Sequence, residues 1–79
     1  MYYVYQIQSI SHPDQKYTGY TTDLKIRMKV HNEGRCPHTS KFIPWNLVNY
    51  FAFSDESKAK KFELYLKSGS GRAFSAKHF

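Results

Sequence analysis

Four side chains that can move a proton or hold a phosphate stand close together near the start of the chain. Tyr5 and Tyr17 lie in two expected strands, and Arg27 and His31 follow in an expected helix. A guanidinium binds phosphate oxygens bidentately and stabilises charge that builds up at phosphorus, whereas an imidazole accepts and returns a proton. We expect these four groups to form one site, because the stretch that carries them is short.

Other interpretations of these residues stay open on the sequence alone. Arg27 and His31 are four residues apart on one helix face, where a solvated basic face is the simpler interpretation. Strand tyrosines usually serve packing, and a catalytic phenol needs a nearby cation or metal-bound water, because its ordinary pKa is about 10. Both tyrosine rings face one site only if Tyr5 lies opposite Gly19 rather than Tyr20, since a one-residue slip reverses the faces.

Glu63 lies at the edge of the apolar stripe of a later amphipathic segment. A buried charge without a partner is costly, so this carboxylate is expected to pair with a base such as Arg27 or, as the second interpretation, to hold a metal. One carboxylate with several waters is a normal way to hold Mg²⁺. A zinc site is not expected at Cys36-Pro37-His38, because the paired spacing of zinc ligands is missing.

The elements that must position these groups follow from residue periodicity and turn signals. We expect strands at Tyr2 to Ser9, Lys16 to Thr21 and Trp45 to Phe53, a helix from about Asp23 to Glu33, and a second helix through about Ser68. Thr22 or Asp23 is expected to cap the first helix and Ser54 the second, and Gly34 to end the first. The order β-β-α-β-α predicts an α+β domain with a three-stranded, mainly antiparallel sheet flanked by helices.

Two further segments carry expectations. The strand from Trp45 to Phe53 has bulky residues on both faces, which suits a central strand, with Leu47, Asn49, Phe51 and Phe53 together on one face. Residues 35–44 contain two prolines and no periodicity, so a surface loop is expected there. The segment from Gly69 to Phe74 is expected to turn.

Composition limits the classes of protein and partner. The 79 residues suit a single domain spanning 1–79, with 18% aromatic residues to build its core. Twelve basic against six acidic residues give a net charge of +6, which favours a polyanionic partner. A single cysteine suits a reducing compartment, and no segment resembles a signal peptide or a membrane span, so a cytoplasmic protein is expected.

Taken together, the motifs resemble the GIY-YIG nuclease domain, which includes the amino-terminal nuclease module of the UvrC-type excinuclease, structure-selective endonucleases, and some homing endonucleases and restriction enzymes. Tyr3-Val4-Tyr5 stands at the first signature triplet and Tyr17-Thr18-Gly19 at the second, and Arg27, His31 and Glu63 follow in the family's order. The stretches Thr21-Thr22-Asp23-Leu24, His31-Asn32-Glu33-Gly34 and Pro44-Trp45-Asn46-Leu47 are similar to short, stand-alone bacterial members.

The resemblance implies a divalent-metal-dependent endonuclease that hydrolyses DNA phosphodiester bonds, on structured or damaged DNA as in repair, with RNA as an alternative substrate and a protein partner for targeting. It implies that Tyr5 is the general base assisted by His31, that Tyr17 orients the water or phosphate, and that Arg27 stabilises the phosphorane. Glu63 would hold one Mg²⁺ or Mn²⁺. The expected nucleic-acid contacts are Lys25, Lys29, Arg35, Lys67 and Arg72.

One departure from the family pattern supports an alternative function. Many members carry an asparagine after the metal-binding glutamate, whereas no asparagine follows Asn49 here. A nucleic-acid-binding module of the same fold that has lost catalysis is therefore the second hypothesis. A small domain whose basic face docks an acidic protein is the third.

Overall fold

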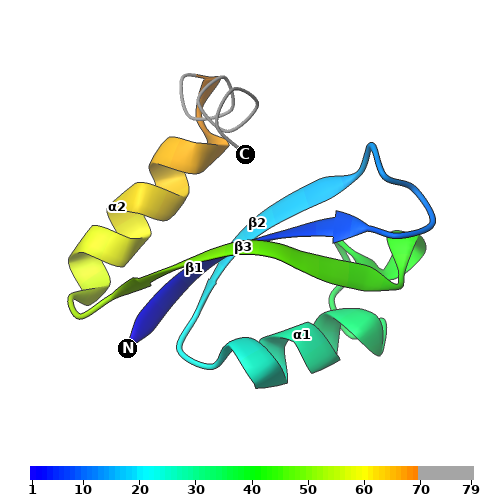
Figure 1. The fold of residues 1–79 in the computed structure, drawn as a ribbon, viewed down its shortest axis with the longest axis horizontal. Helices are drawn as coiled ribbons and strands as arrows, with labels where there is room; N and C mark the ends of the chain where they lie inside the picture. The colour runs from blue at the N-terminus through cyan, green and yellow to red at the C-terminus, as the bar shows by residue number, and fades with distance from the viewer. Residues whose placement is uncertain (70–79) are drawn as a thin grey trace.

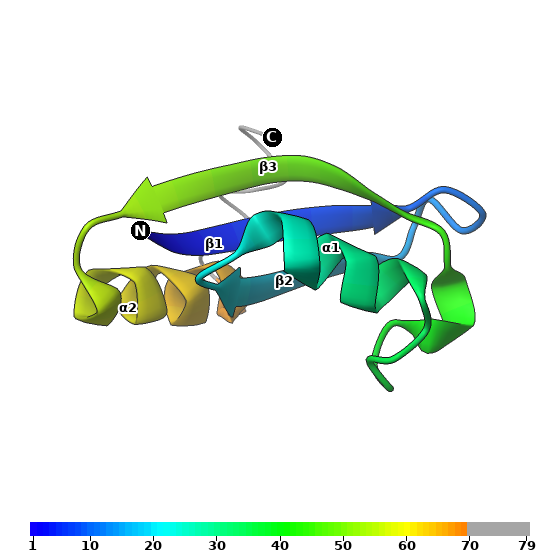
Figure 2. The ribbon, with the colours of Figure 1, turned by 90° about the horizontal axis from the view of Figure 1, so that it is seen from below.

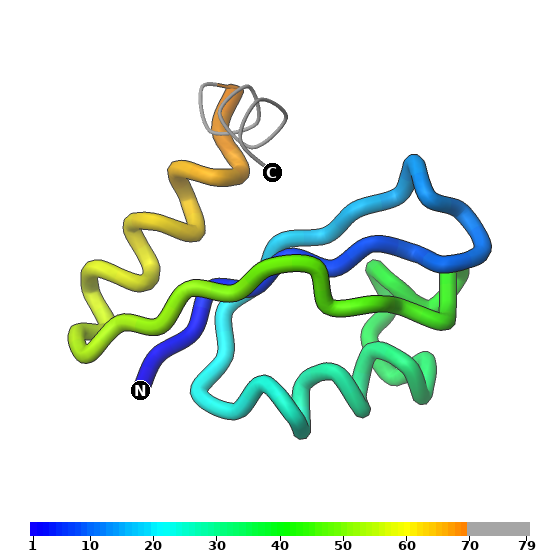
Figure 3. Tube along the Cα trace, viewed as in Figure 1, coloured from blue at the N-terminus to red at the C-terminus, as the bar shows by residue number. Residues whose placement is uncertain are grey.

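The structure is a computed structural model, and it describes residues 1–69. Its elements are β1 (Tyr2–Ser9), β2 (Lys16–Thr21), α1 (Leu24–Asn32), a 3-10 helix (Ser40–Phe42), β3 (Trp45–Phe53) and α2 (Glu56–Lys67). Figures 1 and 3 show the three strands crossing the molecule, with α1 on one side of them and α2 on the other. The expected α+β class and the β-β-α-β-α order are confirmed. The turn expected from Gly69 to Phe74 lies outside the described residues, apart from Gly69 itself.

The sheet is antiparallel throughout and has the order β2-β1-β3. Figure 2 shows β1 between its two neighbours. The prediction that the strand Trp45–Phe53 is central is therefore wrong. Neighbouring residues Val4 and Tyr5 of β1 are 0% and 2% exposed, as a strand covered on both faces requires, whereas Tyr50 of β3 is 56% exposed.

A β-bulge changes which side chains of β3 share a face. Gln6 pairs with Asn49 but the next residue, Ile7, pairs with Leu47, which leaves Val48 as an extra residue in β3. Leu47 consequently packs beside Ile7, while Phe51 packs beside Val4 on the opposite face. The prediction that Leu47 and Phe51 lie on one face is wrong for this reason.

Each face of the sheet carries its own apolar core. On the α2 face the buried residues are Val4, Ala59 and Leu66. On the α1 face they are Tyr5, Ile7 and Trp45, against which Leu24 and Met28 of α1 pack. Both faces of the sheet are covered by a helix, so β1 contributes side chains to both cores. Tyr5 is therefore buried on the α1 face.

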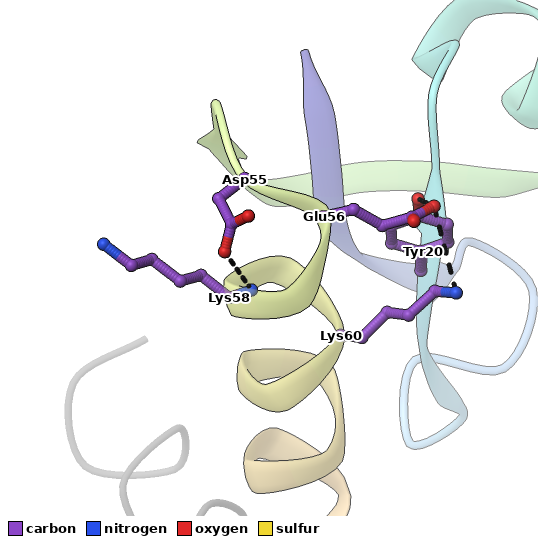
Figure 4. Close-up of polar contacts among 5 residues, drawn as sticks. All are labelled: Tyr20, Asp55, Glu56, Lys58 and Lys60. Atoms are coloured by element: carbon purple, nitrogen blue, oxygen red, sulfur yellow. Dashed lines mark hydrogen bonds and ion pairs between the residues drawn. The ribbon is translucent and has the colours of Figure 1, made fainter.

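Both helices begin at an aspartate. The carboxylate of Asp23 accepts a 3.0 Å hydrogen bond from the amide of Ile26, as expected. Asp55 caps α2 through the amide of Lys58, also at 3.0 Å (Figure 4), so the prediction of Ser54 as the cap is wrong by one residue. Gly34 has a φ of +73°, which confirms the expected left-handed residue after α1.

The segment 35–44 is more than a surface loop. It contains the short 3-10 helix, and Thr39 just before that helix is 0% exposed. The indole nitrogen of Trp45 donates a 2.8 Å hydrogen bond to the carbonyl of Thr39. This bond fastens the segment beneath the α1 face of the sheet. Within residues 1–69, neither helix is both long and apolar enough to span a lipid bilayer.

Candidate active site

Tyr5 lies across β2 at the position of Gly19. The strand register pairs these two residues, as the one-site hypothesis requires. A Cβ atom added to Gly19 would lie 2.3 Å from the hydroxyl oxygen of Tyr5 and 2.5 Å from Cζ, so no residue larger than glycine leaves the ring in place. The glycine of the second triplet therefore makes room for the tyrosine of the first.

A buried line of hydrogen bonds runs from Tyr5 through His31 to Thr39. The hydroxyl of Tyr5 lies 2.8 Å from Nε2 of His31, and Nδ1 of the same ring lies 2.8 Å from Oγ1 of Thr39. His31 is 1% exposed, so the interpretation of the Arg27 and His31 pair as a solvated basic face is wrong for the histidine. An imidazole bonded at both nitrogens is fixed in orientation, as a proton acceptor must be.

Burial keeps both proton-handling groups neutral. Burial raises the pKa of Tyr5, as do the charges of Tyr17, Cys36 and Glu63, while Arg27 acts in the opposite direction and does not prevail. Burial and then Arg27 lower the pKa of His31 below its ordinary 6.5. A neutral phenol therefore faces a neutral imidazole, and activation of the phenol by a cation or a metal-bound water stays a prediction.

Tyr17 joins the same group from the second strand. Its ring centroid lies 6.5 Å from that of Tyr5 and 5.3 Å from that of His31, with tilted and edge-on geometry. The ammonium of Lys67 lies 5.7 Å from the centroid of the Tyr17 ring. Tyr17 thus connects the phenol and imidazole on the α1 face with the last turn of α2.

Glu63 reaches this site through Lys67. Its carboxylate forms a 3.0 Å ion pair with Lys67, four residues further along α2, and its side chain is 19% exposed. A salt bridge was the first interpretation and is confirmed, but the partner is Lys67 rather than Arg27. The negative charge of Glu63 is the smallest of the causes that raise the pKa of Tyr5.

Arg27 lies at the solvent side of the site. It is exposed, and among residues 1–69 its guanidinium has no ion-pair partner. Its positive charge lowers the pKa of both Tyr5 and His31, so it acts on the two groups at once. The structure therefore brings Tyr5, Tyr17 and His31 into contact, and the charges of Arg27 and Glu63 both act on the pKa of Tyr5. Their catalytic roles stay predictions.

The described residues expected to contact nucleic acid lie on several elements of the fold rather than within the site. Lys25, Lys29 and Arg35 are exposed, and Arg35 forms a 3.2 Å ion pair with Glu33. Lys67 is held by Glu63. Arg72 lies outside the described residues. Lys25 and Lys29 are therefore exposed cations of α1, on the flank of the helix opposite Arg27.

Glu63 is a single carboxylate ligand, so a metal ion held there would need water molecules as further ligands. Among residues 1–69 there is no group of three or more histidine, cysteine, aspartate or glutamate side chains that could hold a metal. Cys36 is a free cysteine. A half-buried carboxylate such as Glu63 suits Mg²⁺ or Mn²⁺, which keep several waters and take further oxygen ligands from a phosphate.

A polar cluster outside the site holds α2 against β2. The hydroxyl of Tyr20 donates a 2.8 Å hydrogen bond to Glu56, which pairs with Lys60 at 3.8 Å, and the Lys60 ammonium lies 5.6 Å from the Tyr20 ring centroid (Figure 4). Burial and the bond to Glu56 raise the pKa of Tyr20 to about 12. Glu56 and Glu63 are about two helical turns apart, so both carboxylates lie on the same face of α2.

The sequence did not predict two features of the site, which are the burial of Thr39 and the ion pair between Glu63 and Lys67. Thr39 lies in an irregular segment, and no pattern indicated its burial. The link between Lys67 and Glu63 had a visible signal, because a glutamate four residues before a lysine on a helix pairs with it.

Comparison with known proteins places the chain in a family. The GIY-YIG catalytic domain matches residues 1–76. The chain therefore belongs to the GIY-YIG family, a family of nucleases. It is also similar to UPF0213 proteins of Streptococcus pyogenes, including those of serotype M5 (strain Manfredo) and serotype M3 (strain SSI-1). Each is 38% identical over 58 residues, which cover 72% of this chain and 63% of the relative.

Proposed function

We propose that the chain is a divalent-metal-dependent endonuclease that hydrolyses phosphodiester bonds of structured or damaged DNA. The observation that carries the proposal is the buried 2.8 Å hydrogen bond between the Tyr5 hydroxyl and Nε2 of His31. A packing role for Tyr5 would require only its ring, whereas this bond joins its proton to a base. Family membership supports the nuclease class. The relatives' names give no activity, and the preference for structured DNA and a role in repair rest on the resemblance.

The neutral states of Tyr5 and His31 suit a proton relay. As the oxygen of an attacking water approaches phosphorus, its proton passes to the Tyr5 oxygen, and the Tyr5 proton passes to Nε2 of His31. The phenol never becomes a free phenolate, which agrees with its raised pKa. The imidazole can accept the proton because Nε2 lies 2.8 Å from the Tyr5 hydroxyl, and its lowered pKa favours the neutral ring.

The more exposed groups would meet the phosphate. Arg27 is open on the solvent side and would bind two phosphate oxygens and stabilise the charge of the transition state. Tyr17 is partly exposed beside Tyr5 and would orient the water or the phosphate.

Glu63 would hold one Mg²⁺ or Mn²⁺, which would screen the charge of the leaving oxygen. In the structure, Lys67 forms an ion pair with this carboxylate. A partly exposed ion pair is worth about 0–1 kcal/mol, so a divalent ion can displace it.

The test is cleavage of labelled duplex, nicked, flap, branched and single-stranded DNA with Mg²⁺ or Mn²⁺ and with a chelator. We expect cleavage by the wild type that Glu63→Ala loses. Glu33→Ala is the matched control, because Glu33 also forms a surface ion pair, but with Arg35 just beyond the end of α1. The proposal is refuted if the wild type cleaves no substrate more than Glu63→Ala does. RNA substrates in the same panel decide between the two nucleic acids.

A catalytically inactive binding module is the second candidate. The missing asparagine after Glu63 and the exposed lysines Lys25 and Lys29 favour it. Salt-dependent binding to DNA without turnover would support this candidate, and absence of binding at low salt would remove it. For either function we propose a cytoplasmic location, which suits the free cysteine, and a protein partner that supplies targeting.

A further inference from the structure

Thr39 makes three contacts that a packing role does not require. Its side chain is fully buried, and Oγ1 lies 2.8 Å from Nδ1 of His31. The same oxygen donates to the carbonyl of Cys36 at 3.4 Å, and the Thr39 carbonyl accepts the indole hydrogen of Trp45. Both ends of the residue are therefore fixed, and the hydroxyl is held against the imidazole.

The direction of these bonds determines the state of the histidine. A hydroxyl has one proton and a carbonyl can only accept, so the bond to Cys36 uses the proton of Thr39. The same carbonyl also accepts the amide hydrogens of Thr39 and Ser40, at 3.1 and 3.0 Å. In the arrangement in which Thr39 donates to it, Oγ1 faces Nδ1 with a lone pair and Nδ1 carries the hydrogen. A neutral imidazole with hydrogen on Nδ1 has a lone pair on Nε2, directed at the Tyr5 hydroxyl.

We propose that Thr39 is a positioning residue that holds His31 in the tautomer able to receive the proton of Tyr5. This proposal rests on the proposed function for its catalytic consequence, but not for the tautomer itself. In the opposite tautomer Nε2 would donate to Tyr5, and the phenol would have no base to receive its proton.

The proton count closes along this line. Water loses one proton to the Tyr5 oxygen while its oxygen electron pair forms the bond to phosphorus, and Tyr5 loses its own proton to Nε2. The bond from phosphorus to the leaving oxygen breaks, and that oxygen departs with the electron pair and takes a proton from solvent. His31 ends as an imidazolium with hydrogen on both nitrogens, and the Nδ1 hydrogen stays bonded to Thr39. The charged and titratable groups that face His31 are Tyr5 from β1, Tyr17 from β2 and Arg27 from its own helix. Thr39 faces it from the 35–44 segment and adds no charge.

The first test reads the tautomer directly and needs no substrate. Long-range nitrogen–proton NMR spectra of the full chain with ¹⁵N-labelled histidine distinguish the two neutral tautomers, and loss of signals in His31→Gln assigns the ring. We expect hydrogen on Nδ1 in the wild type above neutral pH. Hydrogen on Nε2 in the wild type would overturn the proposal, whether or not any variant folds.

The second test compares two substitutions. Thr39→Val keeps the shape and removes the hydroxyl, whereas Thr39→Ser keeps the hydroxyl. We expect Thr39→Val to lose the single tautomer and to lower kcat about 10- to 100-fold with KM unchanged, as removal of a group that orients an imidazole usually does, while Thr39→Ser restores both. Wild-type kcat in a folded Thr39→Val would overturn the proposal.

The two proposals fail in different ways. A wild type without nuclease activity but with hydrogen on Nδ1, lost in Thr39→Val and kept in Thr39→Ser, would refute the function and support the role of Thr39. A wild type that cleaves DNA with hydrogen on Nε2 would do the reverse.

Discussion

Gly19→Ala tests the contact between the two signature triplets. The backbone of Gly19 is outside the left-handed region, so alanine meets no conformational strain there and only space is at issue. The added Cβ would lie 2.3 Å from the Tyr5 hydroxyl oxygen, whereas ordinary contact begins at 3.4 Å, so the ring must move by roughly 1 Å. A shift of this size breaks the 2.8 Å hydrogen bond to His31.

The expected cost follows from overpacking a core. Inserting a methyl group into a filled site costs about 1–3 kcal/mol. For a domain of this size we expect Tm to fall by roughly 5–20 °C. Urea unfolding and thermal melts measure the stability, and the DNA cleavage assay measures the rate, which we expect to fall by a factor of about 100 or more because the relay is interrupted.

Two comparisons make the reasoning refutable. In a Tyr5→Ala background the same Gly19→Ala change should cost less than about 0.5 kcal/mol, because the clashing ring is absent. Gly34→Ala is the control for a lost glycine, since nothing lies within 4 Å of its Cβ and its φ of +73° gives a stability loss of about 1 kcal/mol without loss of cleavage. Wild-type stability and activity in Gly19→Ala would refute the close contact.

Three further changes test the charges around the site. Lys67→Met should lower the Mg²⁺ concentration needed for half-maximal cleavage, because the ammonium no longer competes for Glu63; an unchanged or higher requirement would contradict this. Arg27→Lys should slow cleavage while leaving Tm unchanged, because an ammonium cannot bind phosphate bidentately, and equal rates would argue against that role. The pKa of His31 is lowered on folding, so the unfolded chain binds the proton more readily; stability should be full above pH 6.5 and fall as pH drops through and below it. The urea midpoint of unfolding is measured at about pH 7.5 and about pH 5 for the wild type and for His31→Gln. A midpoint that does not change between these pH values in either chain would contradict this prediction.

Residue periodicity was sufficient for the elements and their order. Alternating aromatics in Tyr2–Ser9 and the aspartate and glycine around α1 are local signals that act within a few residues, and they specified the strand and the helix ends. The register of Tyr5 opposite Gly19 could be stated as a requirement, because only one register places both tyrosines on one face.

The wrong predictions for β3 and for residues 35–44 have a common physical cause. The structure of each segment depends on contacts with residues outside it. Bulky residues on both faces of β3 indicated a central strand, but Val48 and Tyr50 are left exposed and the bulge at Val48 reverses the alternation. Thr39 is buried where it forms hydrogen bonds with His31 and Trp45, which are 8 and 6 residues away in sequence. No local pattern in residues 35–44 contains that information.

The most direct test of the central claim is the single-turnover cleavage rate of Tyr5→Phe beside its affinity for the same DNA. This change removes one oxygen and leaves the ring that packs against Ile7 and Trp45. If Tyr5 passes a proton to His31, we expect unchanged DNA affinity and a rate at least about 100-fold below the wild type. A folded Tyr5→Phe that cleaves at the wild-type rate would contradict the proton relay.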